Sequence, residues 1–360
     1  MKKLKAALIG CGRIGTKKHI EAYIQNIYDI ELITVCDVET TKADNAANIY
    51  EEKTGIKIKV ETDYRDLLNT DLDFVTIATE SGYHYEISME FLKAGINVLV
   101  EKPMALSTKH MDEMIEIARE KNLKLGVCLQ NRFNEPVQEL RKKIENGDFG
   151  RVFTANARIL WNRNEEYYKQ ASWRGTWDQD GGTLMNQCAH NIDLLQWMLG
   201  SEIEEVYGVT RNFKHPYIET EDFGTGIIKF KNGSIGILEG ASNVFPKNLE
   251  ETLSVFGDKG TVVLGGLAVN KILTWRFENE DTHPFMNLDD PDTVYGNGHV
   301  PLFKDFAEAI RENREPYITG EDGRKEVDIT LAIYKSSIEN KPVKFPIEYS
   351  TEECKLFKKV

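Results

Sequence analysis

The stretch Gly10-Cys11-Gly12-Arg13-Ile14-Gly15 decides the fold, because it follows an apolar run directly and opens a helix-like segment. Gly10 permits a tight turn, Gly12 lets the backbone approach a pyrophosphate, and Gly15 lets a helix pack closely on a strand. Free N–H groups at the start of such a helix bind phosphate oxygens. The stretch predicts a dinucleotide-binding turn whose cofactor contacts are Gly10, Gly12, Arg13, Ile14 and Gly15.

An acidic residue at the end of the next apolar run indicates which dinucleotide is bound. At the position of Asp37, a carboxylate accepts hydrogen bonds from the adenosine ribose hydroxyls and repels a 2′-phosphate. The adjacent Cys36 and Val38 offer no arginine for such a phosphate. We therefore expect NAD rather than NADP. The alternative is a glycine-rich loop with an unrelated surface acid.

Residues 1–129 alternate between short apolar runs and helix-like stretches. The runs lie at 5–9, 31–36, 56–60, 73–78, 97–100 and 124–128, and the helix-like stretches at 14–25, 42–53, 83–94 and 107–121. Strands buried on both faces and separated by helices indicate a parallel sheet. We predict an α/β protein whose first domain, residues 1–129, is a doubly wound parallel sheet.

The pattern changes in residues 130–360. Longer runs that alternate apolar and polar residues lie at 152–161, 203–213, 223–230, 234–240 and 253–256; helices are predicted at 135–145, 182–199, 301–313 and 321–340, and a loop at 279–299. Alternation leaves one face of a sheet wetter than the other, as in antiparallel sheets. We predict a second α/β domain, for substrate binding and oligomerisation, with a large, open, mostly antiparallel sheet.

Composition narrows the class of protein. The 360 residues carry a net charge of −13, which argues against nucleic acid or an anionic membrane as a partner. No apolar run reaches the roughly 18 residues that span a bilayer. The five cysteines are odd in number and widely spaced, which disfavours a disulfide framework or a metal site. We expect a cytoplasmic protein without a metal.

Two stretches offer groups for chemistry. Lys102, in Val100-Glu101-Lys102-Pro103, follows the fifth run, at the edge where open α/β sheets bind ligands. Gly181-Gly182 precedes a predicted helix, on which Asn186, His190 and Asp193 at spacing i, i+4 and i+7 share one face. Read separately, a solvated lysine and the wet side of a helix explain these residues equally well.

Taken together, these motifs resemble the glucose–fructose oxidoreductase / inositol dehydrogenase family of NAD(P)-dependent enzymes over essentially the whole chain. The resemblance implies a Rossmann domain followed by an α/β domain with an open sheet. It also implies that Lys102 and His190 flank the substrate carbon that gives hydride to the nicotinamide. Further cofactor contacts are then expected at Thr79, His84, Glu101 and Lys102.

Other stretches look like the sugar-nucleotide branch of that family. They are Ala78–His84, Gln130–Phe133, Trp161–Arg163 and Trp173–Trp177. This branch includes dehydrogenases that oxidise the 3-hydroxyl of UDP-N-acetylglucosamine or its uronate, whose ketone an aminotransferase then converts to an amine. Many inositol-type members have Asp four residues before the histidine, whereas this chain has Asn186. An amide cannot be a charged partner for imidazolium, but it can position the histidine or a substrate hydroxyl, so Asn186 is grouped with the catalytic residues.

Arginines are expected to bind the substrate, because a diphosphate needs local positive charge on an acidic protein. The predicted substrate contacts are Arg132, Arg158, Arg163, Tyr168, Arg174 and Asn186. Each arginine could instead be an ordinary surface charge, and the tyrosine a packing residue.

The predicted reaction is removal of the 3-hydroxyl proton by His190, or by Lys102 through a shared path, as hydride leaves. The alternatives are a free-cyclitol or free-sugar dehydrogenase, an NAD-dependent glycosidase, and an NAD sensor without turnover. The residues leave open whether C6 of the sugar is a hydroxymethyl or a carboxylate. A homodimer or homotetramer through the open sheet is expected, with the aminotransferase as a possible pathway partner.

Overall fold

The computed structural model describes residues 2–200, 202–278 and 296–357, so most of the loop predicted at 279–299 lies outside the described residues. The chain forms two compact units. The first comprises residues 1–105, 109–129 and 299–324, and the second comprises residues 106–108, 130–298 and 325–360. The first unit therefore includes residues 299–324, from late in the chain, so no single boundary in the sequence separates the two units.

The first unit contains the predicted doubly wound parallel sheet, in the order β3-β2-β1-β4-β5-β6. Its strands are β1 (Leu4–Ile9), β2 (Ile30–Cys36), β3 (Lys59–Glu61), β4 (Phe74–Ile77), β5 (Asn97–Glu101) and β6 (Leu125–Cys128). All five pairings are parallel. The order reverses between β1 and β4, which places the carboxyl ends of these strands at a ligand-binding crevice.

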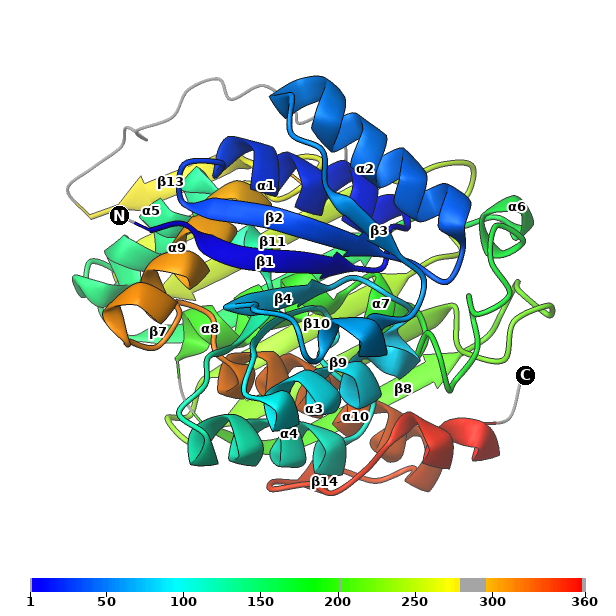
Figure 1. Cartoon of the computed structure of the whole chain (residues 1–360). Helices are drawn as coiled ribbons and strands as arrows, with labels where there is room; N and C mark the ends of the chain where they lie inside the picture. Colours follow the sequence, from blue (N-terminus) through cyan, green and yellow to red (C-terminus); the bar gives the residue numbers. More distant parts are fainter. Residues whose placement is uncertain (1, 201, 279–295, 358–360) are drawn as a thin grey trace. The chain divides into compact units, whose positions relative to one another are not determined.

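Helices cover this sheet. They are η1 (Gly15–His19), α1 (Ile20–Gln25), α2 (Thr40–Thr54), η2 (Tyr64–Leu67), η3 (Ser81–Tyr83), α3 (His84–Ala94), α4 (Thr108–Glu120) and α9 (His299–Glu312). Figure 1 shows α9, in orange, beside α1. The aromatic rings of Phe303 and Phe306 in α9 pack on Tyr23 and Phe74 of this unit.

The second unit contains an eight-stranded sheet in the order β13-β12-β11-β7-β10-β9-β8-β14. Its strands are β7 (Val152–Leu160), β8 (Ile203–Arg211), β9 (Phe223–Phe230), β10 (Ile235–Ala241), β11 (Glu250–Gly257), β12 (Gly260–Gly265), β13 (Lys271–Phe277) and β14 (Val343–Lys344). Only the β7–β10 pairing is parallel, so the expectation of a mostly antiparallel sheet is confirmed. The last three strands are absent from the sequence prediction.

One face of this sheet is covered by helices, and the other carries exposed side chains. The helices of this part of the chain are η4 (Gln130–Phe133), α5 (Glu135–Glu145), α6 (Glu165–Tyr168), α7 (Thr183–Asn186), α8 (Ala189–Leu199), α10 (Gly320–Glu339) and η5 (Thr351–Leu356). Helices α7 and α8 pack on the central strands. The helix predicted at 182–199 is therefore two helices, interrupted at residues 187 and 188. No helix of the described residues combines the length and the apolar character that crossing a membrane requires.

Candidate functional site

The glycine-rich turn after β1 has the geometry of a dinucleotide-binding turn. Gly10 has φ +93°, and a Cβ there would lie 2.5 Å from the Ala78 carbonyl carbon. A Cβ on Gly15 would overlap the Gly10 carbonyl oxygen. In contrast, a Cβ on Gly12 would meet nothing within 4 Å, so this side of the turn is open to a bulky group. The turn fits the pyrophosphate of NAD, with Arg13 exposed and Ile14 half-buried on it.

Asp37 is positioned by the same turn. It follows β2, and its carboxylate accepts hydrogen bonds from Cys11 N at 2.8 Å and Glu39 N at 2.9 Å. These contacts fix an anionic acceptor at the strand end, where the ribose of a dinucleotide lies.

Replacing Asp37 by alanine is expected to raise the KM for NAD about 10–100-fold, because hydrogen bonds to a charged group contribute about 1.5–3 kcal/mol. The KM for NADP should stay the same or fall, since the charge that repels a 2′-phosphate is gone. Initial rates with both cofactors measure this. An unchanged ratio of the two KM values would show that Asp37 does not select the cofactor.

Two of the residues predicted as cofactor contacts, Thr79 and His84, follow β4. Thr79 is half-buried after β4 and donates from Oγ1 to the Glu80 carbonyl. His84 is only 1% exposed, with Nδ1 2.7 Å from the Pro103 carbonyl oxygen and Nε2 3.2 Å from that of Thr79. Burial lowers the pKa of His84 despite these hydrogen bonds. These contacts make His84 a buried link between two loops, and its contact with the cofactor stays a prediction.

Glu101 is buried beneath the half-buried Lys102. Its carboxylate lies 3.0 Å from Nε2 of both His19 and His299. With Cys128, these side chains form a group of potential metal ligands within the described residues. The Glu101 carboxylate thus takes part in this interior cluster, and its contact with the cofactor stays a prediction.

In the second unit, His190 lies in the first turn of α8 and contacts Gln130. The His190 Nε2 and Gln130 Nε2 atoms are 3.1 Å apart. A glutamine amide can donate to an unprotonated ring nitrogen or, after a flip, accept from a protonated one. The Gln130 side chain therefore suits a histidine that changes its protonation state. Gln130 was not among the predicted site residues, although the stretch Gln130–Phe133 resembles the sugar-nucleotide branch.

Asn186 ends α7, so the break after it separates Asn186 from the helix of His190. The Asn186 amide donates to Asp180 Oδ1, and Asp180 Oδ2 accepts from Gly175 N at 2.7 Å. Asp180 is buried and connects α7 to the loop before it. The expected single stripe of Asn186, His190 and Asp193 is thus wrong as helix geometry, although Asn186 and His190 are both half-buried.

Gly182 immediately precedes α7 and packs against the buried carboxyl group of Glu221. It has φ +103°, and a Cβ there would overlap Glu221 Oε2. Glu221 Oε1 accepts from Leu184 N and from the Tyr334 hydroxyl, each at 2.8 Å. Burial raises the pKa of Glu221 to about 8, so it is mostly neutral at pH 7. This contact requires glycine at residue 182 and sets where α7 begins.

Two arginines and three aromatic rings form an alternating stack near α6. Arg163 lies 4.6 Å from the Trp161 ring centroid and 5.1 Å from that of Tyr167, and Arg174 lies 4.4 Å from Tyr167 and 4.5 Å from Trp173. Arg174 also donates to the Tyr167 hydroxyl at 2.6 Å. In the described part of the chain, neither guanidinium forms an ion pair with a carboxylate. Two uncompensated cations on so acidic a chain are suited to an anionic ligand.

A buried carboxyl group close to the stack does not cancel this charge. Burial raises the pKa of Glu251 to about 8, although the nearby Asn191 and the charge of Arg163 act in the opposite direction. Glu251 is therefore mostly protonated at pH 7, and Arg163 keeps its positive charge available.

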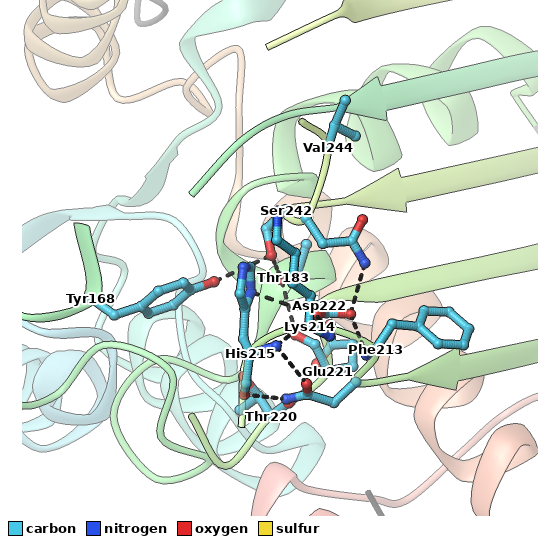
Figure 2. Close-up of polar contacts among 12 residues, drawn as sticks. Tyr168, Thr183, Phe213, Lys214, His215, Thr220, Glu221, Asp222, Ser242 and Val244 are labelled. Carbon is cyan, nitrogen blue, oxygen red and sulfur yellow. Dashed lines mark hydrogen bonds and ion pairs between the residues drawn. The ribbon is translucent and has the colours of Figure 1, made fainter. Parts of the chain in front are cut away.

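Figure 2 shows the polar network that anchors this region. The Tyr168 hydroxyl lies 3.2 Å from Ser242 Oγ, which lies 2.9 Å from Thr183 Oγ1. Asp222 accepts from three successive backbone N–H groups, at residues 213–215. Tyr168 is 7% exposed, and burial raises its pKa. Tyr168 is thus a packing residue that ties α6 to the sheet, and Tyr167 is the tyrosine in the arginine stack.

Two of the predicted substrate arginines have other partners. Arg132 is 1% exposed and forms a bidentate ion pair with Asp193, with Nε–Oδ2 at 2.8 Å and Nη2–Oδ1 at 2.6 Å. Arg158 lies on the sheet face opposite α8, between Glu239 and Glu250, each at 2.9 Å. The structure therefore corrects both expectations: Arg132 is an interior ion-pair residue and Arg158 a surface one.

Comparison with known proteins gives the family. Residues 4–129 match the oxidoreductase family with an NAD-binding Rossmann fold, and residues 137–263 match the GFO/IDH/MocA C-terminal domain. The WlbA dehydrogenase from Bordetella pertussis, solved with NADH and UDP-GlcNAcA, is 34% identical, with a TM-score of 0.84 over 96% of this chain and 100% of that one. The WlbA dehydrogenase from Chromobacterium violaceum, solved with the same two ligands, is also 34% identical, with a TM-score of 0.83 over 97% and 98% of the two chains.

A more distant relative acts on a different kind of sugar. The D-glucoside 3-dehydrogenase of Escherichia coli K12 is 25% identical over 93% of this chain and 95% of its own. The family matches indicate an NAD-binding oxidoreductase. The geometry of the glycine-rich turn and the position of Asp37 agree with this assignment. This chain is an NAD-dependent oxidoreductase of the GFO/IDH/MocA family.

Proposed function

We propose that this enzyme oxidises the 3-hydroxyl of a UDP-N-acetylated hexose, either UDP-GlcNAc or its uronate, to the ketone. The observation that carries the proposal is the stack of Arg163, Tyr167 and Arg174, whose two guanidinium groups lack carboxylate partners in the described residues. The Tyr167 hydroxyl also accepts a hydrogen bond from Gln187, in the break between α7 and α8. A diphosphate bound by the stack would therefore lie on the same unit as His190. Both WlbA relatives were solved with UDP-GlcNAcA.

The chemistry requires an acceptor for hydride and an acceptor for the hydroxyl proton. Bound NAD would supply the first, and the turn at Gly10 and Asp37 would hold it. His190 takes the hydroxyl proton, since an imidazole has a pKa near neutral pH. Gln130 keeps the ring oriented before and after the transfer, and Asn186 positions the sugar. Lys102 stabilises the oxygen as its proton leaves or shares the proton path.

The direct test is a panel of UDP-sugars with NAD and NADP. Reduced nicotinamide is followed by absorbance, and the ketone is trapped chemically or by a coupled aminotransferase, which also draws an unfavourable equilibrium forward. We expect NADH formation with UDP-GlcNAc or its uronate. Absence of turnover with every UDP-sugar would end the proposal, and a preference between the two would identify the group at C6.

The arginine stack gives a sharper prediction. Arg163→Met and Arg174→Met should each raise the KM for the UDP-sugar about 10–100-fold, with a smaller effect on kcat, since a charged hydrogen bond to phosphate contributes about 1.5–3 kcal/mol. Arg158→Met, on the opposite face of the sheet, is the matched control and should leave KM unchanged. If the control raises KM as much as the stack variants do, the diphosphate does not bind at the stack.

The second candidate is oxidation of a free sugar or cyclitol, which the D-glucoside 3-dehydrogenase relative favours. Free sugars would then react as well as UDP-sugars, and the Arg163→Met variant would keep full activity on them. The remaining alternatives have distinct outcomes in the same panel. Net hydrolysis without lasting NADH indicates a glycosidase, and NAD binding without hydride transfer indicates a sensor.

We further propose a cytoplasmic homodimer or homotetramer that pairs through the open sheet. Tyr207, Ile227 and Ile237 are neighbours in register across β8, β9 and β10, and each is at least 39% exposed. Light scattering of Ile227→Lys beside the wild type tests the assembly. A monomeric wild type would contradict it.

A further inference from the structure

Three side chains converge on the carboxylate of Glu101 in the interior of the first unit, and the proposed reaction uses none of them. His19 from η1 and His299 from α9 each place Nε2 3.0 Å from Glu101 Oε1. Cys128, at the end of β6, places its sulfur within 4.8 Å of the ligand atoms of those two histidines and of Glu101. Glu101 is 7% exposed and the other three at most 2%. Four separate elements thus meet at one buried acid.

Hydrogen bonding explains this cluster better than a metal does. Its ligand atoms lie within 4.8 Å of one another, and two histidines, a carboxylate and a cysteine can bind zinc. A metal-bound imidazole almost always donates its other ring N–H to an acceptor. Here Nδ1 of both His19 and His299 is buried without a partner. If each Nε2–H instead donates to Glu101, both Nδ1 atoms are bare lone pairs, and no N–H group is stranded.

The electrostatics agree with an anionic Glu101 beside a neutral His19 ring and a protonated Cys128 thiol. Burial alone raises the pKa of Glu101, but the hydrogen bonds from His19 and His299 outweigh it and hold that pKa well below its usual value. Burial lowers the pKa of His19, so its ring stays neutral. Burial, reinforced by Glu101, raises the pKa of the Cys128 thiol, which keeps its proton.

The carboxylate is connected directly to Lys102. Its second oxygen, Oε2, accepts the backbone N–H of Lys102 at 3.2 Å, while Oε1 faces the histidines. Interior ionic clusters seldom stabilise a fold more than well-packed apolar side chains would. A cluster that binds the amide of a proposed active-site lysine therefore suggests a role in placing that lysine.

We propose that His19 and His299 are positioning residues, which act through the Glu101 carboxylate to fix the backbone and the side-chain direction of Lys102. This inference rests on the proposed function for its link to catalysis. It goes beyond that function in assigning a purpose to α9, which packs on α1 from a distant part of the sequence.

Paired substitutions test the proposal. Glutamine can place an amide N–H near the position of a histidine Nε2, whereas leucine cannot. His19→Leu and His299→Leu should each lower kcat about 10–100-fold, as expected for a lost hydrogen bond to a charged group. The KM values for both substrates should stay close to wild type. His19→Gln and His299→Gln should recover most of kcat, and Glu101→Gln provides the same test if a leucine variant does not fold.

A readout without substrate separates this inference from the proposed function. Reductive ¹³C-methylation makes lysine resonances visible by NMR, and a Lys102→Gln variant identifies the Lys102 signal. Its chemical shift and titration midpoint should move in the leucine variants and in Glu101→Gln, but not in the histidine-to-glutamine variants. Wild-type protein that turns over no UDP-sugar would end the proposed function and leave this result intact.

Two results would overturn the inference. One is leucine variants that melt at a lower temperature yet keep kcat and the Lys102 resonance, which indicates a purely structural cluster. The other is stoichiometric zinc in the purified wild type that His19→Gln loses, because the cluster would then be a metal site.

Discussion

Replacement of His190 by alanine is expected to lower kcat about 10²–10⁴-fold, the usual contribution of a general base. The half-buried side chain contacts Gln130 and lies on the helix-bearing face of the sheet, so its loss should leave the fold and the affinity for NAD near wild type. Stopped-flow measurement of NADH formation and a thermal melt of the same sample test both statements.

The pH profile adds a signature. Wild-type kcat/KM should fall on the acid side, because a protonated imidazole cannot accept the hydroxyl proton. The alanine variant should lack this limb. Gln130→Ala is the matched variant, with a smaller loss of rate, because the ring remains but is no longer held. If His190→Ala and Lys102→Ala both kept full activity, neither would be a catalytic residue.

Arg132→Met is expected to lower the free energy of unfolding by about 3–5 kcal/mol, because it leaves the carboxylate of Asp193 buried without its cation. Both side chains are about 1% exposed, and their two hydrogen bonds are short and parallel. The double variant Arg132→Met/Asp193→Leu should regain much of this loss, since no buried charge remains. Urea denaturation of the three proteins measures the effect.

An exposed ion pair supplies the control. Arg119 is paired with Glu321 at 3.1 Å with its side chain 73% exposed, so Arg119→Met should change stability by less than about 1 kcal/mol. If Arg132→Met instead unfolded like the wild type and raised the KM for the UDP-sugar, Arg132 would be a substrate contact.

Local sequence patterns were sufficient to predict most of the fold of the first unit. All of its strands except β3, which is Lys-Val-Glu, are short apolar runs next to helices. The glycine-rich turn and Asp37 are consecutive in this pattern, so periodicity and turn chemistry predicted both the sheet and the cofactor. The strands β12, β13 and β14, which lie at the two ends of the second sheet, were missed. β12 begins and ends with glycine, and β14 has only two residues. β13 carries Ile272 and Leu273 side by side, so its pattern does not alternate.

Partners distant in sequence could not be predicted. Arg132 and Arg163 both lie within two residues of an aromatic residue in the sequence. Among the described residues, however, only Arg132 of the two forms an ion pair with a buried carboxylate, that of Asp193 in α8. The roles of Tyr167 and Tyr168 could not be predicted for the same reason. The two are adjacent in sequence, and only the helical turn of α6 determines that Tyr168 is the one buried in the interior.

The sequence by itself determined the type of protein: a glycine turn between a strand and a helix, an acid after the second strand, and a lysine and a histidine in familiar contexts. These features depend on residues that are neighbours along the chain. Only the tertiary structure decided which charges remain available to a ligand. Arg132, Arg158 and Glu101 each have partners supplied by other elements, whereas Arg163 and Arg174 stack on aromatic rings without a carboxylate among the described residues. Whether a charge is neutralised depends on groups that folding brings to within a few ångströms, and sequence spacing does not record that distance.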